Sequence, residues 1–453
     1  MSFGSDSVQV HLPLAALDKC FRCRKTDAKL RVCSSCGEVL YCSEECQKKD
    51  WKAHKSNCGK TVRLDLETYY PFVAALQYTN HLLLLHRPAT LHPALERKIL
   101  NSPNPGSTED ILLLPDGSDE GSRIILLGDK IEESERDTPT WWPTARSAQV
   151  RNKLMRRIMT EGNMLPIVLS TALALVTEIY STPHSRTDGA RLRLQSRHSP
   201  IADIGIAKGP IRVTSKDRLS YMLKENSEFI LGQDPKEHCW IYFITLDGHE
   251  YILDCGMFAF NMATGVNAKE YCQPATALPP YTWVPVMPLT AGWNPKHRFS
   301  VLRNVELRKA TMVMMRVGTK PMRHGPEEDY ILSWMEYVGG RTCTKLEKAT
   351  MMELLQDNSL VFRLNLITRE YQNFPQTPAD VTVSVDLDPD QDPSTHPDFN
   401  RQAQAQERYL KAKTKQLRKG QISAKQWDRA LDRWLALKRL DEVRREAAAA
   451  SRR

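Results

Sequence analysis

The sequence has no apolar run long enough to cross a bilayer. Its most apolar stretch, Met164 to Tyr180, is interrupted by Pro166, Ser170 and Glu178, whereas a membrane-spanning helix needs roughly 20 mostly apolar residues. The N-terminus also lacks a basic start followed by a continuous apolar core, so it does not resemble a secretory signal. Both absences predict an intracellular chain, in the nucleus or cytoplasm, whose thiols stay reduced.

Cysteine is scarce outside one short segment. Seven of the eleven cysteines lie between Cys20 and Cys58, and none occurs between Cys58 and Cys239. A dense cluster in a reduced, intracellular protein predicts metal binding rather than disulfides.

Most of the chain carries no net positive charge. The net charge is +9, but residues 401–453 contain 16 Lys and Arg against 6 Asp and Glu, which leaves −1 for the preceding 400 residues. The basic character therefore belongs to the C-terminal segment.

The cysteine cluster forms four closely spaced ligand pairs. They are Cys20-x2-Cys23, Cys33-x2-Cys36, Cys42-x3-Cys46 and His54-x3-Cys58. A C-x2-C turn presents two thiolates to one ion, and an x3 spacing places both ligands on one helical face. Eight ligands predict two closed, structural tetrahedral zinc sites, although spacing alone leaves open whether the pairs combine sequentially or interleave.

The order of these pairs, together with Tyr41-Cys42, Cys46-Gln47 and Asp50-Trp51, resembles the MYND-type zinc finger. The resemblance covers residues 20–58. It implies an interleaved arrangement: Cys20, Cys23, Cys42 and Cys46 hold one zinc ion, and Cys33, Cys36, His54 and Cys58 hold the other.

Short helices are expected in the second half of the finger. Ser43 is a plausible N-cap with Glu44 and Glu45 in the first turn, and Asp50 is expected to cap a following turn. About 40 residues cannot bury a sufficient core unaided, so zinc is expected to stabilise the module, by roughly 10–16 kcal/mol.

The resemblance also implies a ligand. MYND fingers bind proline-rich peptides, typically Pro-x-Leu-x-Pro, through positions that match Ser34, Gln47 and Trp51 here. Alternatively, Trp51 is a core aromatic that covers the zinc sites, and Ser34 and Gln47 are solvated polar residues. DNA contact by the finger is disfavoured, because no helix presents a run of base-reading side chains.

Residues 60–385 predict an α+β middle domain of unknown function. Helices are expected at Leu66–Leu85, with Asp65 as N-cap, and at 145–159, 165–180 and 345–356, the last followed by an apolar run at 360–367. Residues 101–140 are interpreted as loops around short apolar runs such as 124–127. Trp240–Ile244, the Asp247-Gly248 turn and Tyr251–Leu253 predict a β-hairpin.

The hairpin places His238 at the start of one strand and Asp254 at the end of the next. This arrangement resembles the base and orienting residue of a transglutaminase-like site, but the upstream cysteine nucleophile is missing. Cys239 alternates to the other face of the strand. An ordinary hairpin is the simpler interpretation, and a degenerate form of that fold is the alternative.

SET-type methyltransferases also carry MYND fingers, inserted within the catalytic domain. Here the finger begins at Cys20, which leaves no room for the preceding part. The Asn-His pair at Asn80-His81 is followed by four leucines rather than by the x-Cys that the family requires. We therefore expect no such activity, and we find no complete catalytic constellation elsewhere.

The C-terminal part predicts an acidic, proline-rich linker at 386–400 and a basic helical tail at 401–453. Gly420 breaks the helical pattern and Ser423 can cap a second helix, in which Trp427, Leu431, Trp434 and Leu437 share one face. The tail is a solvated helical hairpin or a binder of nucleic acid.

Together these features predict an N-terminal tail (1–19), a small two-zinc finger, a larger α+β domain and a C-terminal basic helical segment. The expected function is that of an adaptor whose finger recruits a proline-containing peptide of a partner protein. The alternatives are a nucleic-acid or chromatin adaptor that uses the tail, and a degenerate transglutaminase-like domain.

Overall fold

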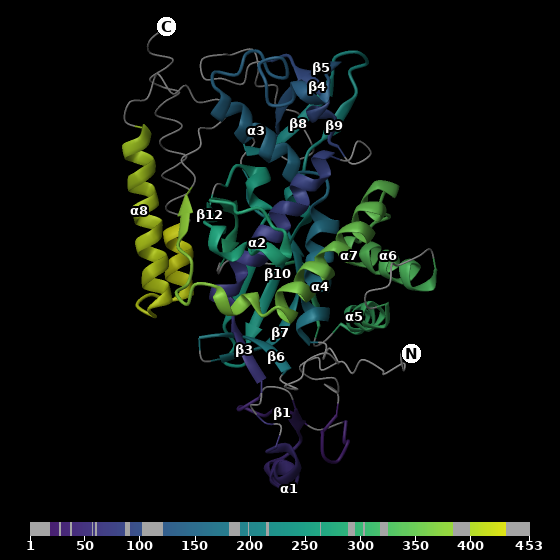
Figure 1. The fold of residues 1–453 in the computed structure, drawn as a ribbon, viewed down its shortest axis with the longest axis vertical. Coiled ribbons are helices and arrows are strands. Elements are labelled where there is room, and N and C mark those ends of the chain that lie inside the picture. The colour runs from purple at the N-terminus through teal and green to yellow at the C-terminus, as the bar shows by residue number, and fades with distance from the viewer. Residues whose placement is uncertain are drawn as a thin grey trace.

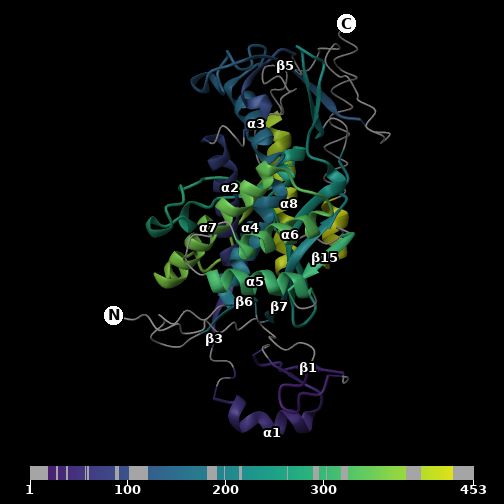
Figure 2. The same cartoon turned by 90° about the vertical axis from the view of Figure 1, so that its right-hand side faces the viewer.

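The computed structural model describes residues 19–431 with internal gaps. The gaps are 27–28, 37–38, 57, 59–60, 87–90, 102–120, 181–190, 198, 214–216, 263, 289–294, 302–303, 318–324 and 384–398. The predicted N-terminal tail up to residue 18, most of the predicted linker, and Trp434 and Leu437 lie outside the described residues. Figures 1 and 2 show the finger at one end of the molecule, a mixed helix and strand body in the middle, and a small sheet at the opposite end.

The central sheet is mostly antiparallel and has seven strands. Its strand order is β14 (Met287–Pro288), β11 (Glu250–Asp254), β10 (His238–Thr245), β7 (Ser199–Gly209), β6 (Arg191–Ser196) and β3 (Thr61–Asp65), with β15 (His297–Ser300) also pairing with β7. The predicted hairpin is confirmed as β10 and β11, paired in the register Ile241 opposite Leu253.

Three helices fill the core against this sheet (Figure 1): α2 (Leu66–Leu83), α4 (Met164–Tyr180) and α7 (Lys345–Ile367). The expected N-cap of α2 is confirmed, because Asp65 Oδ1 accepts a 2.7 Å hydrogen bond from Glu67 N. The α4 side chains are almost all buried. In the described ranges no single helix has the length and apolarity to cross a bilayer, although the bent pair 148–160 and 164–179 meets those criteria together.

The remaining helices pack against these elements, and the second and third of them also bury side chains in this core. They are α3 (Ala148–Thr160), α5 (Val305–Val317), α6 (Pro326–Gly339) and α8 (Phe399–Arg418). Short 3-10 turns are η1 (Leu84–His86), η3 (Pro93–Leu95), η4 (Glu133–Glu135), η6 (Pro235–Glu237), η7 (Met257–Phe260), η8 (Lys269–Tyr271), η9 (Pro274–Thr276) and η10 (Glu370–Asn373).

Two smaller sheets complete the body. One has the order β4 (Arg97–Ile99), β5 (Arg123–Lys130), β8 (Leu219–Leu223) and β9 (Phe229–Leu231). The other has the order β13 (Val284–Pro285), β12 (Thr264–Val266) and β16 (Val381–Val383).

Two sequence-based expectations for the body were wrong. The run 124–127 is part of strand β5 rather than of a loop, because it pairs in parallel with the distant strand β8. The helix that was expected to end at Gln356 continues to Ile367. In that continuation Phe362 and Leu366 are buried while Leu360 and Ile367 are exposed, which is the alternation of a helix with one face on the core.

Candidate metal centre

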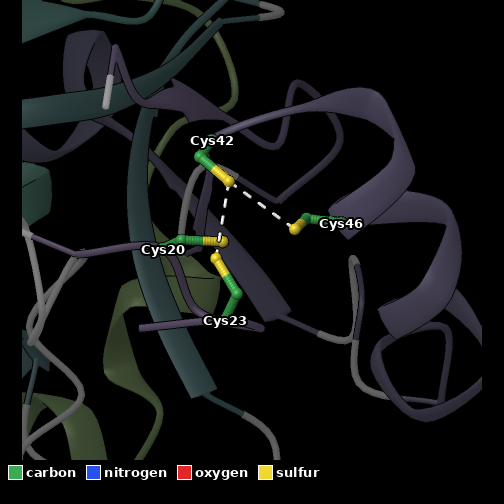
Figure 3. A group of neighbouring side chains, drawn as sticks. All are labelled: Cys20, Cys23, Cys42 and Cys46. Carbon is green, nitrogen blue, oxygen red and sulfur yellow. Dashed lines mark hydrogen bonds between the residues drawn. The ribbon is translucent and has the colours of Figure 1, made fainter. Parts of the chain in front are cut away.

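The first group of ligands joins the first and third cysteine pairs of the finger. The sulfur atoms of Cys20, Cys23, Cys42 and Cys46 all lie within 4.8 Å of one another. Figure 3 shows them converging on one small space, with Cys42 Sγ 3.5 Å from both Cys23 Sγ and Cys46 Sγ. In a tetrahedron with Zn–S bonds of about 2.3 Å, the sulfur atoms are about 3.8 Å apart. The group therefore fits one zinc ion.

The second group combines three thiols with one imidazole. Cys33, Cys36, His54 and Cys58 also lie within 4.8 Å of one another. Cys33 Sγ is 3.9 Å from Cys58 Sγ, and Cys36 Sγ is 3.6 Å from His54 Nε2. A tetrahedral zinc with Zn–N near 2.0–2.1 Å would set the S–N separation at about 3.6 Å. The structure thus brings the eight predicted ligands together in the interleaved order.

Two short strands and one helix hold these ligands in position. Strands β1 (Arg31–Val32) and β2 (Leu40–Tyr41) pair directly, and helix α1 (Glu44–His54) follows. Ser43 is the N-cap of α1, as expected, and its hydroxyl accepts a 3.3 Å hydrogen bond from Cys46 N. Cys46 and His54 therefore belong to one helix that supplies a ligand to each zinc group.

Asp50 does not cap a second turn. It lies inside α1, and its Oδ2 accepts a 2.7 Å hydrogen bond from the Tyr41 hydroxyl. Burial and the neighbouring Asp50 raise the pKa of Tyr41, so the phenol stays protonated and remains a donor. The sequence signal was misinterpreted because an aspartate can bond across to a strand as readily as to its own backbone.

The backbone prepares Cys20 to bind a cation. Although burial raises the pKa of this thiol, backbone N–H groups of Cys23, Cys42 and Arg22 stabilise the thiolate and lower its pKa to about 6. A thiolate is the form that zinc binds.

The three predicted peptide-binding residues lie at the surface or close to it. Ser34 is exposed, Gln47 is half-buried, and the Trp51 side chain is 42% exposed. The Trp51 ring packs against the ring of the ligand His54, with ring centroids 6.0 Å apart. Gln47 and Trp51 are four residues apart on α1 and share one face. Trp51 therefore combines contact with a zinc ligand and an open aromatic face.

In the middle domain, His238 and Asp254 meet. His238 Nε2 is 2.5 Å from Asp254 Oδ2, and both side chains are fully buried. The Asn80-His81 pair has structural contacts: Asn80 donates to Asn358 Oδ1 at 3.0 Å, and His81 Nδ1 lies 3.2 Å from Met159 O. All four side chains are buried.

The described part of the tail packs on the body. Trp427 and Leu431 are buried with Leu410 of α8 and Met287 of β14. Gly420 has φ +66°, and Ser423 Oγ accepts a 3.3 Å bond from Gln426 N, so the expected break and cap are both present. Figure 1 shows α8 lying along one side of the body.

Comparison with known proteins identifies the finger. Residues 20–58 match the family model described as the MYND finger. SET domain-containing protein 14 of Caenorhabditis elegans is 49% identical over 39 residues, which are 9% of each chain. Histone-lysine N-methyltransferase ASHR1 of Arabidopsis thaliana is 43% identical over 49 residues, 11% of this chain and 10% of that protein.

A third relative extends the match only slightly. SET domain and MYND-type zinc finger protein 6 of Schizosaccharomyces pombe is 32% identical over 74 residues, 16% of this chain and 15% of its own. The chain thus covers less than a sixth of these relatives, around the finger, and no solved structure matches it.

Proposed function

Because residues 20–58 form a MYND finger with two zinc-binding groups, we propose that this chain is an adaptor whose finger recruits a proline-containing peptide of a partner protein. The observation that carries the proposal is the open face of Trp51, which is held against His54. A polyproline segment is already extended and loses little conformational entropy when it docks on an aromatic side chain. Zinc would supply rigidity at closed sites rather than chemistry.

Ser34 and Gln47 would complete the docking surface. Ser34 directly follows the ligand Cys33, and Trp51 is one turn before the ligand His54, so the second zinc group links these two parts of the surface. The Ser34 hydroxyl and the Gln47 amide group would donate hydrogen bonds to the peptide carbonyls that a polyproline helix leaves unpaired.

The experiment compares Trp51→Ala with wild type for binding of a Pro-x-Leu-x-Pro peptide, measured by calorimetry on the full chain. We expect a loss of binding of at least tenfold while both zinc ions are retained. Phe229→Ala removes a similarly exposed aromatic from β9, 45% exposed and outside the finger, and should leave binding unchanged. Unchanged peptide affinity in a Trp51→Ala protein that retains both zinc ions would refute the proposal.

A second candidate partner is nucleic acid, bound by the tail. Arg408, Lys411 and Lys415 are exposed at a spacing that places them on one face of α8. Trp427 would not take part by base stacking, since only 4% of its surface is exposed. Binding of the full chain to DNA or RNA that is insensitive to salt, or absent at low salt, would eliminate this candidate.

We include no reaction in the proposal. The His238–Asp254 pair is the feature that most resembles catalytic machinery, and both members are fully buried. An adaptor requires only the finger surface and a stable body.

A further inference from the structure

Helix α1 carries three exposed lysines beside the proposed docking face. Residues four apart are neighbours on a helix surface, so Gln47, Trp51 and Lys55 form one row along α1. Lys48 and Lys52 form the row next to it. Lys55 is the C-cap with helical backbone angles, and its N–H donates to the Trp51 carbonyl at 2.7 Å. The three lysines, called the lysine patch below, therefore border any peptide that lies on Trp51.

The row on the other side of Trp51 belongs to the interior of the finger. It contains Cys46 and His54, which are members of the two zinc groups. Between them is Asp50, whose carboxylate accepts the hydrogen bond from the Tyr41 hydroxyl and is buried. The open side of the docking face is thus the side of the lysine patch.

The charge of the lysine patch is only partly neutralised within the finger. Lys48 Nζ lies 2.6 Å from Glu44 Oε1. Among the described residues, no carboxylate pairs with Lys52 or Lys55. Cations in the last turn of a helix also offset its dipole, but both side chains are exposed and remain accessible to a ligand. A ligand that fits this face carries negative charge as well as proline.

The chain itself contains a segment of that chemistry. Residues 385–393 read Val-Asp-Leu-Asp-Pro-Asp-Gln-Asp-Pro. They belong to the acidic linker between β16 and α8, and they lie outside the described residues. A residue before proline favours an extended backbone, and an extended chain turns successive side chains to opposite sides. Extension of this segment would place Leu387, Pro389 and Pro393 on one edge and the four aspartates on the other.

The two edges match the two parts of the α1 surface. Leu387 and Pro389 have the spacing of the Leu-x-Pro half of a Pro-x-Leu-x-Pro ligand, and Val385 stands where that ligand has its first proline. This edge would contact the exposed ring of Trp51. The aspartate edge would then face the lysine patch. Opposite charges across an interface speed association and select the partner.

The position of the segment favours the finger of another molecule. The segment is attached at both ends, to β16 and to α8, and these two elements contact each other. A loop that returns to its starting region reaches at most half of its extended length, which is about 3.5 Å per residue. Figures 1 and 2 show the finger beyond one end of the body and apart from α8. The finger of a second copy is free of this limit.

From these observations we propose that the finger of one copy binds residues 385–393 of a second copy, with Leu387 and Pro389 on Trp51 and the aspartates against the lysine patch. The inference rests on the adaptor proposal, because it uses the same face of α1 and names a ligand for it. The contact joins two different surfaces, so it either closes as a reciprocal pair or continues as a chain of molecules.

Analytical ultracentrifugation of the full-length, zinc-loaded chain over a concentration series tests the proposal. We expect self-association that weakens at least fivefold between about 50 mM and 500 mM salt, because salt screens exposed charges. Lys52→Gln combined with Lys55→Gln should weaken association at least fivefold at low salt. Both positions are exposed, so this variant should fold as wild type does.

Lys49→Gln is the matched control. Lys49 is an exposed lysine of the same helix, but it lies two residues before Trp51 and therefore on the opposite side of α1. This variant should associate as wild type does. Equal weakening by Lys49→Gln and by the Lys52 and Lys55 substitutions would overturn the proposed position of the aspartates.

Mixing two variants tests whether the contact joins separate molecules. Trp51→Ala retains the linker but lacks the docking face, and Leu387→Ala combined with Pro389→Ala retains the face but lacks the ligand. Each variant alone should remain monomeric, whereas their equimolar mixture should associate. A wild-type chain that stays monomeric, or a linker variant that associates as wild type does, would overturn the inference.

Calorimetry separates this inference from the adaptor proposal. The Pro-x-Leu-x-Pro peptide is titrated into the linker variant, Leu387→Ala combined with Pro389→Ala, in which the segment of the chain itself does not compete. If the peptide binds and wild type stays monomeric, self-association is wrong and the adaptor proposal stands. If the peptide does not bind and wild type stays monomeric, both proposals are wrong.

Discussion

The Tyr41 hydroxyl donates a 2.7 Å hydrogen bond to the buried carboxylate of Asp50, and it thereby fastens strand β2 to helix α1. Tyr41 precedes the ligand Cys42, and Asp50 lies one turn before the ligand His54. The bond therefore connects the segment that carries Cys42, of the first zinc group, to the segment that carries His54, of the second, and it does so without the metal.

Tyr41→Phe should weaken the finger without removing a ligand. The substitution leaves a buried carboxylate oxygen without its donor, which costs about 1–3 kcal/mol. We expect faster alkylation of the finger cysteines at a fixed chelator concentration, measured by mass spectrometry. Tyr330→Phe, which removes a hydroxyl bonded to Glu306 in the body, should not alter that rate. Equal alkylation rates in wild type and Tyr41→Phe would contradict the role of this bond.

Glu161 should make the stability of the body dependent on pH. Burial raises the pKa of this carboxyl to about 8, while Arg157 and the Tyr221 hydroxyl, 3.1 Å from Oε2, favour the ionised form. The folded state thus retains a proton that the unfolded state, with a pKa near 4.3, loses. The stabilisation is present below that value and disappears as pH rises towards 8, by about 1.4 kcal/mol per unit.

Glu161→Gln removes this titration. Between pH 5 and pH 8 the variant should show a shallower decline in the free energy of unfolding than wild type, measured with urea. Glu225→Gln, at a side chain that is 59% exposed, should keep the wild-type slope. If Glu161→Gln and wild type decline in parallel, the buried carboxyl is not the source of the dependence.

Trp427 should hold the described part of the tail to the body. It is buried with Leu410, Leu431 and Met287, and its Nε1 donates to Thr414 Oγ1 at 3.4 Å. Truncation of a buried tryptophan costs about 3–5 kcal/mol. Trp427→Ala should therefore accelerate tryptic cleavage within α8 at least tenfold, whereas Lys425→Ala, at an exposed position, should not. Unchanged protection in Trp427→Ala would show that other contacts fix the helix.

The sequence predicted features that depend on nearby residues. The eight ligand positions, the Ser43 and Asp65 caps and the β10–β11 hairpin all follow from spacing or turn chemistry within a short segment. The meeting of His238 and Asp254 followed from the same hairpin, since the two lie at the adjacent ends of paired strands.

Features that depend on distant partners could not be predicted. Strand β3 pairs in parallel with β6, with Val62 opposite Leu192. The sequence of either segment does not indicate which strand it will pair with. The same holds for β5 and β8. The local pattern also gave a wrong prediction for Asp50, because an aspartate can either cap a helical turn or accept a hydrogen bond from another element. Here Asp50 accepts a hydrogen bond from the Tyr41 hydroxyl.

Metal analysis of the purified full-length chain tests the central claim most directly. Zinc is measured by mass spectrometry alongside alkylation of the native protein with iodoacetamide. The account predicts two equivalents of zinc per chain, and protection of Cys20 through Cys58 that ends when a chelator removes the metal. Far fewer than two equivalents, or ready alkylation of these thiols in the native state, would contradict it.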